Sequence, residues 1–491
     1  MVPIDLNKLA QRRGIDLSRW PPRYDKAYRP GPDEPEWFPE IERADPPERD
    51  PIIFAKLSAQ VRYAWERSPF YRRKWQEAGV SPQTLRRLED LSRFPVVQKQ
   101  ELRAAQTDNP PYGDYLCIEP GQVARIHGTS GTTGKPTVFG IGADDWSRIA
   151  EAHARILWAC GIRPSDRVLI CSFFSLYLGS WGALAGVERL GATAFPFGAG
   201  VSGQTLMAVQ WARELRPSAF YATPSYALHL AEVARREKID PRELGFRILF
   251  FSGEPGAGIA ATKQLIETTF GGACIDMGSM AEMSPWMTNG ECSHRTGMHL
   301  WQDIVYTQVC DPKTFQPVRF GGEGTPVYTH LERTSQPMIR LVSGDLTRWT
   351  DEPCPCRRSY PRLPQGIYGR IDDMFIVRGE NIYPGAVEDV LRATEGFGGE
   401  FRIIISRREA MDELLIRAEC DAAHWPARQQ LEATMRERLK ARLGVHPVME
   451  LVPSGTLPRT EFKARRVIDD RQMYRQRVGE SHEQPPRRHD V

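Results

Sequence analysis

The middle of the chain alternates short apolar runs with amphipathic segments. The runs are short, apolar and bounded by Gly, Pro or Ser; they are residues 167–173, 192–197, 219–223, 246–254 and 272–279. Segments with helical periodicity lie between them, for example residues 225–238 and 260–270. This alternation predicts an α/β fold with a mostly parallel, helix-covered sheet. Such sheets bind ligands at the carboxyl ends of their strands.

A second pattern begins near Ile371, where strand-like runs alternate with two helical segments and predict a small α+β domain. At the other end, residues 1–50 contain nine prolines, so this segment cannot form long helices. We expect it to be an arm that drapes over the body or is partly disordered. The predicted division is a Pro-rich arm (1–50), a large domain (51–370), a small domain (371–471) and a polar tail (472–491).

One uncharged stretch of the chain has the length of a membrane-spanning helix. Val168 to Val187 contains no charged residue over 20 positions, which is long enough to span a bilayer. The stretch starts like a strand, ends like a helix and contains interspersed serines and glycines. These features favour a strand, a loop and a helix that cross a protein core. A membrane-spanning helix is the alternative.

The composition is that of a globular protein, with 41% hydrophobic and 26% charged residues. The formal net charge of +3 gives no global argument for a nucleic-acid or membrane partner. Nine cysteines are too few for a disulfide scaffold, and the first residues show no apolar secretory signal. We therefore expect a cytoplasmic protein that binds neither nucleic acid nor membrane.

The clearest chemical signal is a loop rich in glycine and hydroxyl side chains within RIHGTSGTTGKPTV, residues 125–138. Glycines let successive N–H groups converge on an anion, while hydroxyls and a lysine add donors and charge. The loop is not a Walker A motif, because a proline follows its lysine. It predicts a polyphosphate site, with a ligand-free surface turn as the alternative.

This loop closely resembles the phosphate loop of the adenylate-forming superfamily, and most of all that of its phenylacetate–CoA ligase branch. Other segments resemble that branch in the same order; they are SPFYRRKWQEAGV (68–80), FPVVQKQELRAAQTDNPPYG (94–113), SGEP (252–255), GDLTRW (344–349), YGRIDDMFIVRGENIYPGAVEDVL (368–391) and LPRTEFKARRVIDDR (457–471). The resemblance spans roughly residues 55–470. It implies that the large domain binds ATP and an acid, and that the small domain is mobile.

The resemblance also implies roles for individual residues. Ser130, Gly131, Thr132, Thr133, Gly134 and Lys135 would hold the β- and γ-phosphates. Glu282 would help to hold Mg²⁺, and Asp345 would take the ribose hydroxyls. Arg370 would contact ribose or phosphate, and Asp372 would be the hinge. Lys463 would neutralise charge at the α-phosphate and the acid. Read without the resemblance, each is a loop, cap or surface residue.

Two motifs depart from the family pattern. The family usually carries Tyr-Gly-x-Ser/Thr-Glu, which ends in its metal-binding glutamate and whose tyrosine packs on adenine. Here Gly278 stands at the tyrosine position, so the stacking surface is missing and adenine must be held in another way. Leu341 and Val342 replace the Tyr and Arg that often precede the ribose-binding motif.

The acid pocket is harder to assign. Phe174, Tyr177 and Trp181 are candidates for aromatic walls, which suit an aromatic acid, and Gly253 could let the acid approach the backbone. Ordinary core packing is the alternative. Separately, Cys292, His299, Cys354 and Cys356 form a Cys₃His set that suits a structural Zn²⁺, as in some members of this branch. His294 is a rival ligand, and four unrelated residues are the alternative.

The resulting hypothesis is an AMP-forming ligase that activates an aryl or arylalkyl acid with ATP and Mg²⁺ and transfers it to CoA. One alternative is an adenylase that passes the acyl group to a carrier protein or a nitrogen nucleophile. Another is a nucleotide-sensing protein that has lost catalysis. The sequence does not decide whether the protein forms a homodimer.

Overall fold

The computed structural model describes residues 13–129, 136–199, 203–278, 280–285, 287–371, 375–377, 380–408, 411–458 and 466–469. Contacts between Cα atoms divide the chain into two compact units. The first comprises residues 1–258 and 263–368, and the second comprises residues 369–491 together with 259–262.

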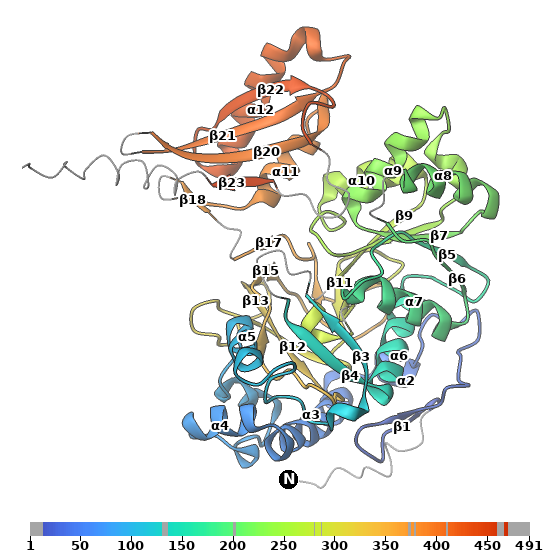
Figure 1. The fold of residues 1–491 in the computed structure, drawn as a ribbon, viewed down its shortest axis with the longest axis vertical. Helices are drawn as coiled ribbons and strands as arrows, with labels where there is room; N and C mark the ends of the chain where they lie inside the picture. Colours follow the sequence, from blue (N-terminus) through green and yellow to red (C-terminus); the bar gives the residue numbers. More distant parts are fainter. Residues whose placement is uncertain are drawn as a thin grey trace, which may run out of the picture. The chain divides into compact units, whose positions relative to one another are not determined.

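The first unit is built on an eight-stranded sheet in the order β16-β11-β10-β9-β8-β7-β5-β6 (Figure 1). Its strands are β5 (Arg167–Ile170), β6 (Thr193–Pro196), β7 (Ala219–Ala222), β8 (Ile248–Phe251), β9 (Ala273–Gly278), β10 (Asn289–Glu291), β11 (Met298–Leu300) and β16 (Arg362–Leu363). The strands from β6 to β9 are parallel, and the strands beyond β9 are antiparallel. The predicted α/β class with a mostly parallel sheet is confirmed.

Helices cover both faces of the parallel strands, as Figure 1 shows. Alternate residues of β5 and β7 pack with α6 and α7 in one apolar cluster and with α8, α9 and α10 in another. All four residues of β7 and of β8 are buried, as expected for strands covered on both sides. The helices are α6 (Ala143–Ala159), α7 (Leu178–Leu190), α8 (Gln204–Leu215), α9 (Pro224–Arg236) and α10 (Ala260–Phe270).

The uncharged stretch 168–187 therefore crosses the core as β5, a loop and most of α7. Among the described residues, no helix has both the length and the apolar character needed to cross a membrane.

The sequence patterns missed a second, antiparallel sheet in the first unit. Its strands β12 (Val305–Cys310), β13 (Glu323–His330), β14 (Leu341–Val342) and β15 (Asp345–Arg348) follow one another in the chain without helices between them. A separate hairpin pairs β3 (Val123–Gly128) with β4 (Val138–Gly142), and the glycine-rich loop connects its two strands.

The described part of the arm lies against the first unit. Trp37, Phe38 and Ile41 are buried with α6 and the parallel strands. The first long helix begins at Pro46, five residues before the expected position, because prolines are tolerated in the first turn of a helix. The elements of this region are β1 (Ile15–Asp16), β2 (Arg23–Tyr24), α2 (Pro39–Glu42), α3 (Pro46–Arg67), α4 (Pro69–Glu77) and α5 (Lys99–Asp108).

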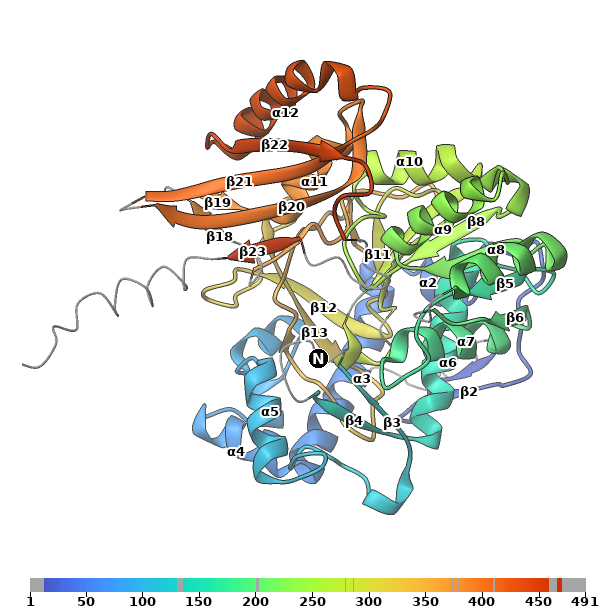
Figure 2. The same cartoon turned by 45° about the horizontal axis from the view of Figure 1, so that its top comes forward.

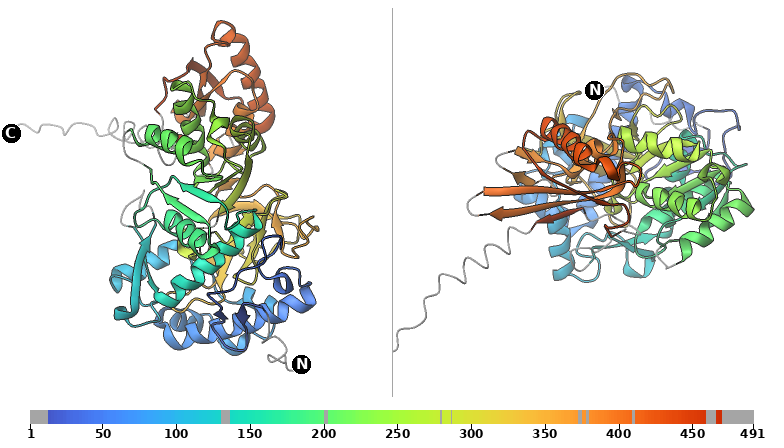
Figure 3. Two further views of the ribbon diagram at one scale, coloured as in Figure 1. Left: turned by 90° about the vertical axis from the view of Figure 1, so that its right-hand side faces the viewer. Right: turned by 90° about the horizontal axis from the view of Figure 1, so that it is seen from above.

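The second unit has a four-stranded sheet in the order β22-β21-β20-β23. Helix α12 lies along one face of this sheet (Figures 2 and 3). The elements are β17 (Gly369–Arg370), β18 (Phe375–Val377), β19 (Glu380–Ile382), α11 (Pro384–Arg392), β20 (Phe397–Arg408), β21 (Met411–Cys420), α12 (Arg428–Leu443), β22 (Val448–Pro453) and β23 (Val467–Asp469). The last strand was not predicted.

Candidate functional site

Three hydroxyl groups gather at the carboxyl ends of the parallel strands. Tyr221 lies in β7, and Ser252 follows β8 directly. Their hydroxyls share a hydrogen bond of 2.8 Å, and the hydroxyl of Tyr177 hydrogen-bonds to both. Burial raises the pKa of Tyr177 to about 12, so its hydroxyl stays protonated at neutral pH. The trio can donate to or accept from a polar group of a bound ligand.

The glycine-rich loop starts beside this hydroxyl cluster. The backbone N–H of Gly128, at the end of β3, donates to the carbonyl of Leu176 at 2.9 Å, next to Tyr177. The base of the loop is closed where Thr129 and Thr137 hydrogen-bond to each other. Residues Ser130, Gly131, Thr132, Thr133, Gly134 and Lys135 lie outside the described residues. The described flanks therefore place the start of the predicted phosphate loop next to the hydroxyl cluster.

Glu282 lies in a short 3-10 helix, Ala281–Met283, beyond the end of β9. It is 4% exposed, and its Oε1 lies 3.4 Å from Nζ of Lys99 at the start of α5. A buried carboxylate beside a cation is a suitable ligand for Mg²⁺ once a nucleotide supplies further oxygens. Lys99 was not identified from the sequence, although it lies in a segment, 94–113, that carries the family resemblance.

Gly278 ends β9, and no atom of the described residues lies within 4 Å of a Cβ built on it. The position that usually carries the family's tyrosine thus has no described neighbour that a Cβ would contact. Asp345, the predicted ribose ligand, begins β15 and is partly buried. The hydroxyl of Ser343 accepts a hydrogen bond of 3.0 Å from the backbone N–H of Asp345.

The aromatic candidates divide into two environments. Phe174 and Trp181 form a T-shaped pair with ring centroids 5.0 Å apart, and Phe174 packs against the core. The indole N–H of Trp181 donates to the carbonyl of Ser175. Gly253 lies between Ser252 and Glu254 with φ of +95°, a conformation that favours glycine. Tyr177 and Gly253 thus adjoin Ser252, while Phe174 and Trp181 interact with each other.

The remaining predicted residues belong to the second unit. Arg370 lies in β17 and is partly buried. Asp372 and Lys463 lie outside the described residues.

Four metal-ligating side chains of the first unit meet in one buried cluster. The ligand atoms of Cys292, His299, Cys354 and Cys356 all lie within 4.8 Å of one another. The Cys292 and Cys354 sulfurs are 3.7 Å apart, and Cys356 Sγ lies 3.3 Å from His299 Nε2. A tetrahedral Zn²⁺ with Zn–S bonds of about 2.3 Å holds thiolates about 3.8 Å apart, so the set fits this ion. The rival His294 is exposed and lies outside the cluster.

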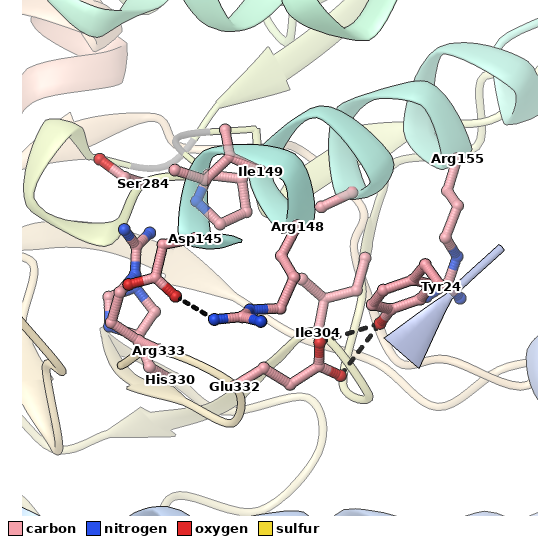
Figure 4. A pocket seen from close by; sticks show the side chains of 12 residues that line it. Tyr24, Asp145, Arg148, Ile149, Arg155, Ser284, Ile304, His330, Glu332 and Arg333 are labelled. Carbon is pink, nitrogen blue, oxygen red and sulfur yellow. Dashed lines mark hydrogen bonds and ion pairs between the residues drawn. The ribbon is translucent and has the colours of Figure 1, made fainter. Parts of the chain in front are cut away.

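A small cavity of about 30 Å³, lined in part by charged side chains, lies where the arm meets the rest of the first unit (Figure 4). Tyr24 of the arm donates to Glu332, which also pairs with Lys56 at 2.6 Å. Asp145 pairs with Arg148 on the other side of the cavity. The volume suits roughly two water molecules, so the cavity is too small for an acid and a nucleotide. The hydrogen bond from Tyr24 to Glu332 attaches the arm here.

Comparison with known proteins identifies relatives over most of the chain. The family model of the AMP-binding enzyme matches residues 73–327, and that of the AMP-binding enzyme C-terminal domain matches residues 379–471. The chain is 36% identical to phenylacetate–coenzyme A ligase of Thermus thermophilus, covering 84% of this chain and 95% of that protein. It is 34% identical to the enzyme of the same name from Escherichia coli, covering 87% and 96%.

Solved structures that are similar to this chain also belong to a CoA ligase. The chain is 52% identical to 2-hydroxyisobutyryl-CoA ligase in the postadenylation state in complex with R3-HIB-AMP, with a TM-score of 0.90 and coverage of 95% of this chain and 99% of that one. The same ligase in the thioesterification state, with 2-HIB-AMP and CoA, is 53% identical, with a TM-score of 0.73 and coverage of 96% and 100%.

Proposed function

Since this chain belongs to the AMP-binding enzyme family, in its phenylacetate–CoA ligase branch, and is thus an AMP-forming acid–CoA ligase, we propose that its acid substrate is a small hydroxy acid. The observation that carries this proposal is the cluster of the Tyr177, Tyr221 and Ser252 hydroxyls. These hydroxyls bond to one another, and a hydroxy acid can join their hydrogen bonds whereas an apolar acid cannot, which favours the hydroxy acid. The identity of 52–53% to a 2-hydroxyisobutyryl-CoA ligase supports the same class of acid.

The reaction has two steps. A carboxylate oxygen of the acid attacks the α-phosphorus of ATP, and pyrophosphate leaves to give an acyl-adenylate. The sulfur of CoA then attacks the acyl carbon, the thiol loses its proton, and AMP leaves with the oxygen that joined it to the acyl group. AMP is needed because a carboxylate is a poor electrophile, so catalysis requires orientation and positive charge around phosphate.

We assign roles to the predicted residues on this basis. The loop from Ser130 to Lys135 holds the terminal phosphates, and Glu282 supplies an oxygen to Mg²⁺, which neutralises phosphate charge. Asp345 accepts from the ribose hydroxyls, and Arg370 contacts the nucleotide. Lys463 neutralises the α-phosphate during adenylation, and Asp372 is the hinge about which the small domain turns between the two steps. The two named states of the similar ligase support such an alternation.

An aryl acid is the second candidate. The T-shaped pair of Phe174 and Trp181 could form an apolar wall, and the curated relatives are phenylacetate–CoA ligases. This candidate predicts that removing the hydroxyls improves, or leaves unchanged, the use of phenylacetate.

The deciding experiment measures ATP-dependent AMP release with 2-hydroxyisobutyrate, isobutyrate and phenylacetate, each with and without CoA. The small-hydroxy-acid proposal requires kcat/KM to be highest for 2-hydroxyisobutyrate. Tyr221→Phe should reduce this preference over isobutyrate about tenfold, the size expected for one lost hydrogen bond of roughly 1.4 kcal/mol. Tyr63→Phe, which removes a hydroxyl bonded to the Thr334 carbonyl, is the matched control. Equal kcat/KM values for isobutyrate and 2-hydroxyisobutyrate would overturn the proposal. A separate assay with a carrier protein or amines in place of CoA would reveal another acyl acceptor.

We further propose that the Cys₃His cluster holds Zn²⁺. Four protein ligands leave no position open for substrate, so this ion would be structural. It would join the β10–β11 hairpin to the loop that carries Cys354 and Cys356.

A further inference from the structure

One arginine that lines the small cavity of Figure 4 has no partner for its charge. Arg333 lies beyond the end of β13 and is only 5% exposed. Gln60 holds its backbone: the Gln60 side chain accepts from the Arg333 N–H at 2.7 Å and donates to the Arg333 carbonyl at 2.8 Å. The guanidinium itself forms no hydrogen bond or ion pair with any residue that the structure describes. A buried cation without an opposite charge is costly, so an anionic group beside Arg333 would stabilise the fold.

The other charged side chains that line the cavity are balanced. Each has an opposite charge beside it; the pairs are Glu332–Lys56, Asp145–Arg148 and Arg155–Asp303. Glu42 also approaches Arg155, but it forms its own pair with Arg358 at 2.8 Å. His330 adds no charge, because burial lowers its pKa to about 3. Arg333 therefore leaves the surroundings of the cavity with one positive charge in excess.

Asp145 does not make up for this excess, because its oxygens bond elsewhere. They accept from Arg148 at 2.6 Å and from the backbone N–H groups of Thr334 and Ser335 at 3.1 and 2.6 Å. Burial would raise the pKa of Asp145, but Arg333 and Arg148 outweigh it and lower that pKa to about 2. Burial lowers the pKa of Arg333 to about 10, which still leaves the guanidinium charged at neutral pH. One carboxylate thus lies near two arginine cations.

We propose that the cavity is a binding site for a small monovalent anion of the size of chloride, held by Arg333 and Arg148. Arg148 bonds to Asp145 and Thr334 through Nη2, so the N–H groups of its Nη1 are available to the anion. A chloride ion is only slightly larger than a water molecule, and a cavity of about 30 Å³ suits roughly two waters. The space therefore accepts chloride and excludes phosphate or an organic acid.

The anion would join segments that are far apart in the chain. Tyr24 brings the arm to the cavity, and Arg148 belongs to α6. Pro285, which also lines the cavity, follows the 3-10 helix that carries Glu282. These segments meet only in the folded protein, so the anion binds the folded state and not the unfolded chain. Its binding should raise the melting temperature as its concentration increases.

Thermal unfolding of the full-length protein tests this site. Chloride is raised from 1 to 100 mM against potassium gluconate, which holds the ionic strength constant and is too large for the cavity. The wild-type melting temperature should rise by about 3 °C or more over this range. Arg333→Met keeps the backbone bonds to Gln60 and should lose this rise. In gluconate alone it should melt at or above the wild-type temperature, because a buried unpaired charge is removed.

Two further variants complete the series. Arg417→Met removes an exposed ion pair with Glu450 in the second unit and should respond to chloride as the wild type does. Arg333→Gln replaces Arg333→Met if that variant does not fold. An equal effect of chloride and gluconate on the wild type would overturn the proposal. A chloride response that both Arg333 variants retain would do the same, because the ion would then bind elsewhere.

Bromide in place of chloride locates the ion directly, because bromide scatters X-rays anomalously. Wild-type crystals grown with 100 mM bromide should show an anomalous peak inside the cavity beside Arg333, and crystals of Arg333→Met should not. A wild-type cavity that holds only water under these conditions would refute the site. Neither experiment measures catalysis, so the result does not depend on which acid the enzyme activates.

Discussion

Lys99 Nζ lies 3.4 Å from Glu282 Oε1 in the first unit. The pair joins the start of α5 to the short helix that follows β9, two segments separated by more than half of the large domain. The side chain of Glu282 is 3% exposed, so the nearby ammonium group compensates a charge that is largely removed from water.

This geometry predicts a shifted magnesium requirement for Glu282→Gln. The amide keeps the size of the side chain but offers a weaker ligand, so the Mg²⁺ concentration for half-maximal pyrophosphate release should rise about tenfold or more. The maximal adenylation rate should fall about 100-fold, the typical cost of one lost electrostatic contact to the transition state. Glu101→Gln, an identical change on the same helix as Lys99, is the control. An unchanged Mg²⁺ titration of Glu282→Gln would exclude Glu282 as a ligand.

Gly278 should tolerate substitution by a larger residue unusually well. A Cβ there meets no atom of the described part of the chain within 4 Å, so Gly278→Ala should change the free energy of unfolding by less than about 0.5 kcal/mol. Gly278→Tyr restores a ring where the family usually has one, and should lower KM for ATP severalfold by stacking on adenine. Gly366→Ala is the contrast: its φ is +62°, and the new Cβ would collide with a carboxylate oxygen of Asp276. Chemical denaturation of the three variants and ATP kinetics of the first two check these values.

The same region shows what the sequence could and could not predict. The strands β5 to β9 were identified because each is a short apolar run bounded by turn residues, and a parallel sheet buries such runs on both faces. The antiparallel strands β12 to β15 lacked helices to mark their limits, so the alternation of strand and helix gave no signal for them.

The candidate site likewise contains residues that the sequence identified and residues that it did not. Glu282 and Asp345 could be named because each lies in a short motif, and the Cys₃His set because its members lie in two short segments that resemble those of the family. The partnership of Tyr221 with Ser252, and of Lys99 with Glu282, depends on segments brought together only by the fold. The arm illustrates a third case: its prolines gave no indication that a long helix would begin at Pro46 or that Tyr24 would reach Glu332.

The Cys₃His cluster predicts that the protein binds zinc through these four side chains. Purified protein should carry about one zinc per chain by elemental analysis, and Cys354→Ser should lose it and melt at a lower temperature, because the ion joins two segments of the fold. Cys160→Ala, which changes a buried cysteine far from the cluster in sequence, should keep the metal. Wild-type protein without stoichiometric zinc, even after expression in zinc-supplemented medium, would refute the assignment.

Buried histidines should make the protein sensitive to acid, and His153 offers the clearest test. This side chain is fully buried in α6, and its Nδ1 lies 2.8 Å from the carbonyl of Gly182. Burial lowers the pKa of His153 to about 3, although the hydrogen bond to Gly182 opposes the change. The unfolded chain, with an ordinary histidine pKa of about 6.5, therefore binds this proton more readily than the folded protein does.

It follows that His153 destabilises the fold as pH decreases from about 6.5 towards 3, by up to about 1.4 kcal/mol per pH unit. Other groups titrate in the same range, so the informative quantity is the difference between wild type and His153→Gln. The variant should be less stable at pH 7.5, because a packed ring is lost, but its free energy of unfolding should decrease less steeply between pH 6.5 and 5. Urea denaturation at several pH values measures both slopes, with the exposed His294→Gln as control. Parallel slopes for wild type and His153→Gln would show that His153 titrates normally in the folded protein.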